Sequence, residues 1–162
     1  MSETTANEGP APAALRDRLR GRTLRSRTGL LLVPPDGLPD APEIAARLGA
    51  DAVDYARLLL DSLPPGAKRL GITADSEQAR LDGVAEAPDG ADLVLVHEFD
   101  LVLSRLAVAD RGRLWRALRE GFPQRRRALL LLMPAGADHL LPEGAEWDAW
   151  QDGGRIARWT QE

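Results

Sequence analysis

Three side chains that could carry chemistry stand close together near the middle of the chain. His97, Glu98 and Asp100 follow the uninterrupted apolar run Leu93–Val96. One imidazole and two carboxylates can act as ligands of a metal ion. On an extended strand neighbouring side chains point to opposite faces, so a chelate by His97 and Glu98 requires a turn at this point. In the alternative interpretation these residues only carry the chain out to solvent, with His97 bonded to a backbone carbonyl.

Serine-based catalysis is not indicated. The G-x-S-x-G turn that presents a nucleophilic serine is absent from the sequence. Ser62, Ser76 and Ser104 stand in helical or capping contexts, and His139 lies in a predicted loop. The sequence therefore argues against a catalytic triad.

The element that positions His97 and Glu98 is predicted to be a buried strand. A short apolar run without alternation, preceded by the turn residues Asp89 and Gly90, is typical of a strand covered on both faces of a parallel sheet. Polar residues just past such a strand lie where open α/β sheets bind ligands. An acid after an apolar strand also has the form of a Walker B segment, whose carboxylates hold Mg²⁺ and orient water. Here His97 stands where the first carboxylate is expected.

Further apolar runs alternate with amphipathic segments along the chain. The other predicted strands are Thr28–Val33, Ala52–Ala56, Ala128–Pro134 and Arg155–Trp159. The predicted helices are Ala13–Arg22, Asp40–Gly49, Asp75–Ala87, Asp110–Gly121 and Glu143–Asp152. For the apolar segments Leu58–Leu60 and Leu101–Leu106 the pattern leaves the type of element open. The alternation predicts an α/β fold with a mainly parallel five-stranded sheet flanked by helices.

Composition and charge limit the function classes. With no cysteine, disulfides and thiolate metal sites are excluded, and a cytoplasmic location is expected. No apolar run has the length of a membrane span, and no apolar signal sequence is apparent at the N-terminus. We expect residues 1–27 to form a disordered basic arm and residues 28–162 to form one domain.

Arginine-rich segments leave room for a nucleic-acid contact. They lie at Arg16–Arg27 and Arg111–Arg127, whereas the whole chain carries a formal net charge of −4. A globally acidic domain is a poor nucleic-acid binder, and such charge runs are usually solvated surfaces. A nucleic-acid-contacting module is therefore the less favoured interpretation.

A strand, a tight loop and a helix at residues 28–49 have the layout of a phosphate-binding loop without its chemistry. Such a loop requires G-x-x-x-x-G-K-[ST], in which the lysine binds phosphates and the hydroxyl binds Mg²⁺. The corresponding residues here are Pro35, Asp36 and Gly37, and no lysine, serine or threonine stands between Val33 and Ala50. We expect this loop to be a degenerate phosphate loop.

The organisation of residues 28–160 resembles P-loop NTPases with an AAA-like core. More narrowly, it resembles the BrxF family, small P-loop proteins of BREX phage-defence systems. The segments that carry the resemblance are Leu63-Pro64 with Arg69 beyond it, Leu93–Glu98, Phe99–Leu103, Leu129–Met133 and Trp150–Ile156. The resemblance implies a P-loop NTPase-like fold, places Glu98 at the catalytic glutamate and makes Leu129–Met133 the sensor strand.

Departures from the family pattern decide the predicted function. His97, Glu98 and Asp100 form a degenerate Walker B, and the sensor strand ends in Met133 and Pro134. The resemblance then implies a non-catalytic accessory subunit of a bacterial multi-protein system of the phage-defence kind, with no cofactor. Its partners would be proteins, including a larger ATPase, and not a membrane. The predicted contact residues are Arg113, Arg116, Arg119, Trp147 and Trp150. The alternative enzyme would hydrolyse ATP with Mg²⁺ and use Glu98.

Overall fold

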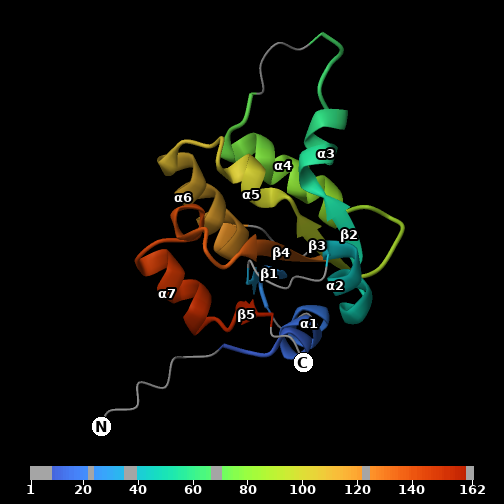
Figure 1. The fold of residues 1–162 in the computed structure, drawn as a ribbon, viewed down its shortest axis with the longest axis vertical. Coiled ribbons are helices and arrows are strands. Elements are labelled where there is room, and N and C mark those ends of the chain that lie inside the picture. Colours follow the sequence, from blue (N-terminus) through green and yellow to red (C-terminus); the bar gives the residue numbers. More distant parts are fainter. Residues whose placement is uncertain (1–8, 22–23, 35–39, 67–70, 122–124, 160–162) are drawn as a thin grey trace.

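A five-stranded parallel sheet forms the centre of the molecule (Figure 1). The computed structural model describes residues 9–21, 24–34, 40–66, 71–121 and 125–159. The strands are β1 (Thr28–Val33), β2 (Asp51–Asp54), β3 (Leu93–His97), β4 (Ala128–Pro134) and β5 (Ile156–Arg158). Their order across the sheet is β2-β3-β4-β1-β5, and every neighbouring pair is parallel. The predicted α/β fold and the number of strands are confirmed.

Helices cover both faces of this sheet. They are α1 (Pro12–Arg20), α2 (Ala41–Leu48), α3 (Tyr55–Asp61), α4 (Ala74–Ala85), α5 (Phe99–Leu103), α6 (Val108–Arg116) and α7 (Ala145–Asp152). A π-helical turn (Ala117–Gly121) extends α6, and a short 3-10 turn (Asp138–Leu140) precedes α7. The helices α1 and α2 pack on one face, and α3 to α7 contribute to the apolar layer on the other (Figure 1). None of the helices in the described part of the chain is both long and apolar enough to span a lipid bilayer.

The strands are apolar on both sides because each face is covered. Leu30 and Leu32 of β1 belong to the core beneath α3 to α7, whereas Leu31 and Val33 face α1 and α2. All six residues of β1 are buried. Period-2 alternation of side chains, combined with burial on both faces, gives the continuous aliphatic run seen in the sequence.

The N-terminal segment differs from the expected solvated arm. Leu15 and Leu19 of α1 are fully buried against the sheet. Arg20 is fixed by a 2.9 Å contact of its Nε with the carboxylate of Asp92 and by a bond to the carbonyl of Gly49. The described residues before 28 therefore belong to the domain, because α1 covers this face of the sheet together with α2.

Two arginines of the predicted basic segments, together with Arg155 near the C-terminus, stabilise the amino end of the sheet. Arg27 is 3% exposed and donates to the carbonyls of Leu19, Arg125 and Arg126. Arg127 contacts Asp51 at 2.7 Å and the carbonyl of Ala91. Buried Arg155 donates to the carbonyls of Ser26 and Thr28, and burial lowers its pKa to about 10. These three guanidinium groups satisfy backbone carbonyls and are not a surface for nucleic acid.

Two helices, α4 and α6, begin at residues other than those predicted from the sequence. The cap of α4 is Thr73, in a reciprocal pair of hydrogen bonds with Ser76, and not Asp75. The helix α6 begins at Val108, two residues before the predicted cap Asp110, whose carboxylate instead pairs with Arg113.

Candidate functional site

The polar cluster lies at the carboxyl edge of the sheet, as its position after an apolar strand predicts. His97 is the last residue of β3 and pairs in register with Asp54 of β2. Its imidazole is 15% exposed, whereas the carboxylate of Glu98 is 47% exposed. Asp54 is occupied by capping α3, since its carboxylate accepts from the backbone N–H of Arg57 at 3.0 Å. Glu98 is therefore the open carboxylate at the end of this strand.

Glu98 makes the sharp turn between β3 and α5. Its φ of 61° and ψ of 17° lie in the left-handed region, and it is the only non-glycine residue with positive φ in the described ranges. This conformation costs an L-residue roughly 1–2 kcal/mol. The turn lets the strand pass directly into a helix whose first residue, Phe99, is fully buried between the rings of Tyr55 and Trp115. Burial of Phe99 thus offsets the backbone strain at Glu98.

This turn brings the imidazole and the first carboxylate together. The Nδ1 atom of His97 lies 3.8 Å from Oε1 of Glu98, so the turn that a chelate would require is present. Asp100, in the first turn of α5, is half-buried. Across the residues that the structure describes, no three His, Asp or Glu side chains are grouped as a metal site. Within the described residues the cluster is the pair of His97 and Glu98.

The neighbouring strand ends present apolar side chains. Val33 at the end of β1 pairs in register with Pro134 at the end of β4, and Met133 is fully buried. The predicted degenerate phosphate loop, Pro35, Asp36 and Gly37, lies outside the described residues. Among the described ends of β1, β3 and β4, chemically active side chains are therefore found only on β3.

The predicted contact arginines on α6 and its π-helical extension are paired with acidic side chains. Arg113 pairs with Asp110, and Arg116 pairs with Glu120. The guanidinium of Arg119 forms a bidentate ion pair with the carboxylate of Glu146, in which Nε lies 2.6 Å from Oε1 and Nη2 lies 3.1 Å from Oε2. This bond raises the pKa of Arg119.

The two predicted tryptophans are placed differently. Trp150 is fully buried, stacks edge-to-face with Trp115 at 5.5 Å and donates its indole N–H to Glu146. Trp147 is half-buried against the same core. Trp150 therefore serves packing, and Arg119 helps to join α7 to the end of α6.

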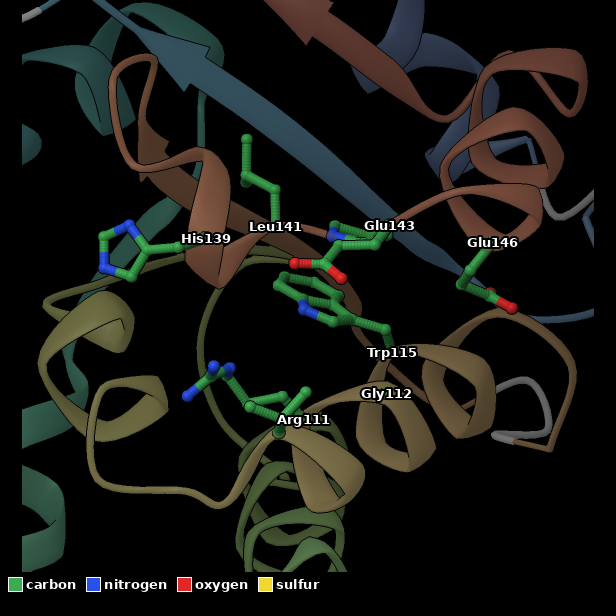
Figure 2. Close-up of a pocket in the computed structure, with 9 residues that line it drawn as sticks. Arg111, Gly112, Trp115, His139, Leu141, Glu143 and Glu146 are labelled. Carbon is green, nitrogen blue, oxygen red and sulfur yellow. The ribbon is translucent and has the colours of Figure 1, made fainter.

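A small pocket lies between α6 and the loop before α7 (Figure 2). The side chains of Arg111, Trp115 and Glu143 converge there, whereas those of His139 and Glu146 point away to either side (Figure 2). Its volume is about 90 Å³, room for roughly three water molecules. Arg111 already donates to the carbonyl of Leu106 at 2.8 Å. The pocket is too small for a nucleotide.

A larger apolar groove, which the sequence did not indicate, lies between α3 and α5. It is lined by Ala56, Leu59, Leu60, Ile72, Leu101, Val102 and Arg105. Its volume is about 140 Å³. The only signal in the sequence is the pair of apolar segments whose element type the pattern leaves open.

Comparisons with known proteins give no family assignment. No protein-family model matches the chain, and no curated protein or solved structure matches it either. The role of the site therefore rests on its own side chains and on the position of the strands that carry them.

Proposed function

We propose that this chain is a non-catalytic, P-loop-like accessory subunit of a cytoplasmic bacterial multi-protein system, acting through protein–protein contacts. The observation that carries the proposal is that the described ends of β1 and β4 carry neither a cationic nor a hydroxyl side chain. His97 stands at the first Walker B position, and β4 ends in Met133 and Pro134. The loop after β1 has no lysine, serine or threonine in its sequence.

The order of the strands supports the P-loop-like part of the proposal. The strand β4 lies between β1 and β3. The segments that the resemblance compares with the phosphate loop, the sensor and the Walker B strand are thus three adjacent strands whose carboxyl ends share one edge. This juxtaposition is what a common nucleotide site would need. The assignment to phage defence rests on the sequence resemblance to the BrxF family.

Electrostatics support the absence of catalysis. Phosphate sites use backbone N–H groups together with a lysine and a metal ion to balance the negative charge. Here Asp36 stands within the loop sequence, Asp40 caps the helix that follows it, and Glu98 adds a third carboxylate at the edge. Without a lysine in the loop to offset them, these carboxylates disfavour the binding of ATP phosphates.

A divergent ATP hydrolase is the second candidate, and one observation favours it. Glu98, which the resemblance places at the catalytic glutamate, has the strained left-handed backbone described above. Strained residues cluster at functional sites. In such an enzyme Glu98 would orient the attacking water, and backbone N–H groups would contact the phosphates.

Calorimetry and a phosphate-release assay with ATP and Mg²⁺ test the proposal on the full chain. We expect no binding tighter than about 1 mM and no turnover. Micromolar binding, with turnover abolished by Glu98→Gln and retained by Glu143→Gln, would show that the chain is an enzyme. Glu143 is a matched control because it is also an exposed glutamate but lies beside α7.

A further inference from the structure

The groove between α3 and α5 has the features of a binding surface. The large apolar side chains that are exposed in the described residues are Leu60 at 60%, Leu101 at 52% and Val108 at 68%. Leu60 and Leu101 line opposite walls of this groove, one from each helix. Exposed apolar side chains gathered on a concave surface indicate an interaction site.

The walls of the groove are preformed. Val102 and Leu103 of α5 are buried, and Phe99 anchors the start of this helix between two aromatic rings. On the other wall, Leu59 and Tyr55 fix α3 to the same core. A groove whose walls are held by the core loses little conformational entropy when it is filled.

A single charged residue lines the groove. Arg105 follows α5, is exposed, and has no side-chain hydrogen bond or ion pair among the described residues. No acidic residue is among the lining residues. A guanidinium beside apolar side chains provides a permanently charged donor for a carboxylate.

We propose that this groove binds an amphipathic α-helix of a partner protein, with an apolar side chain between Leu60 and Leu101 and an aspartate or glutamate paired with Arg105. The proposal names the contact surface of the accessory subunit and rests on that proposed function. The partner segment is a helix because the groove is lined by side chains and offers almost no polar partners. An extended peptide would leave its backbone groups unpaired there, whereas a helix satisfies them internally.

The size of the groove fits one large side chain. An apolar space of about 150 Å³ holds a group as large as benzene, and the groove measures about 140 Å³. We therefore expect one leucine, methionine or phenylalanine as the anchor, with a second apolar residue one helical turn away covering the rim.

The experiment selects from a displayed library of helical peptides, randomised on one face, against the full chain. Selected peptides should carry apolar residues at i and i+3 or i+4 with an acidic residue beside them. Their affinity should fall by about tenfold or more with Leu60→Gln and with Leu101→Gln. Val108→Gln is the matched control, because Val108 is even more exposed than Leu60 and Leu101 but is not among the residues that line this groove.

A charge exchange tests the role of Arg105. Arg105→Glu should weaken the selected peptides, and replacing their acidic residue by lysine should restore binding. No enrichment, binders that are indifferent to Leu60 and Leu101, or binders without a preference for acid would each overturn the proposal. Circular dichroism of each variant confirms that it is folded. Such a failure leaves the non-catalytic function standing, whereas ATP turnover would remove that function without affecting peptide selection.

Discussion

The hydroxyl of Tyr55 donates a hydrogen bond to the fully buried carboxylate of Glu77, which joins the start of α3 to the first turn of α4. The same carboxylate accepts two bonds from Arg80, both at 3.3 Å. Burial, and then the bond to Glu77, raise the pKa of the Tyr55 hydroxyl far above its ordinary value. Since α3 forms one wall of the apolar groove, this buried network holds the groove in shape.

Breaking the Tyr55–Glu77 hydrogen bond should lower the free energy of unfolding by more than the loss of a solvent-exposed hydroxyl would. Tyr55→Phe leaves the buried Oε2 atom of Glu77 with only the longer bond from Arg80, so the free energy of unfolding should fall by about 1–3 kcal/mol. Urea denaturation of Tyr55→Phe, Glu77→Gln and the double variant forms a double-mutant cycle. We expect the double variant to be more stable than the sum of the single losses implies. Additive losses would mean that the two side chains act independently.

The same network predicts a loss of stability at alkaline pH. The folded protein keeps the proton on Tyr55 at a pH where the unfolded chain, with an ordinary pKa of about 10, has lost it. The unfolded state then binds fewer protons, so stability falls as the pH rises above about 10, by at most roughly 1.4 kcal/mol per pH unit. The measurement is the difference between wild type and Tyr55→Phe in urea from neutral to alkaline pH. Arg155, whose pKa of about 10 also lies in this range, contributes equally to both proteins and cancels.

Glycine at position 98 should stabilise the protein. Glu98 has a φ of 61°, which glycine adopts without strain, so Glu98→Gly should raise the free energy of unfolding by about 1 kcal/mol. Glu86→Gly is the control, because Glu86 is also exposed and ends a helix but has a φ of −93°. There the substitution should lower the stability or leave it unchanged. Equal effects at the two positions would show that the turn at Glu98 is not strained.

Local patterns predicted the framework of the sheet and missed features that depend on distant contacts. The uninterrupted apolar runs located β1, β3 and β4, and Asp40 and Gly49 do cap α2 as expected. The mixed segments predicted as strands overlap with β2 and β5, but the predicted β2 extends into α3, which begins at Tyr55. The turn at Glu98 was not predictable, because neither glycine nor asparagine marks it. Its conformation follows from the burial of Phe99 between rings that are remote in sequence.

The site was predicted only in part for the same reason. The position of His97 and Glu98 at a strand end follows from the apolar run before them. The hydrogen-bond partners of the arginines could not be predicted from such a local pattern. They are backbone carbonyls that lie far away along the chain. Arg27, for example, contacts Arg125 across 98 positions. In the sequence, an arginine that bonds buried backbone carbonyls therefore looks the same as one in a surface ion pair.

Stability measurements should separate these two kinds of arginine. Arg127→Met removes a 7% exposed guanidinium that contacts Asp51 and the carbonyl of Ala91. It leaves that carbonyl unpaired, so the free energy of unfolding should fall by about 2 kcal/mol. Arg113→Gln, at an exposed pair with Asp110, should change it by less than about 0.5 kcal/mol. The urea midpoints of both variants report the difference. If Arg127→Met were as stable as wild type and instead abolished DNA binding at low salt, the arginines would serve nucleic-acid contact and not the sheet.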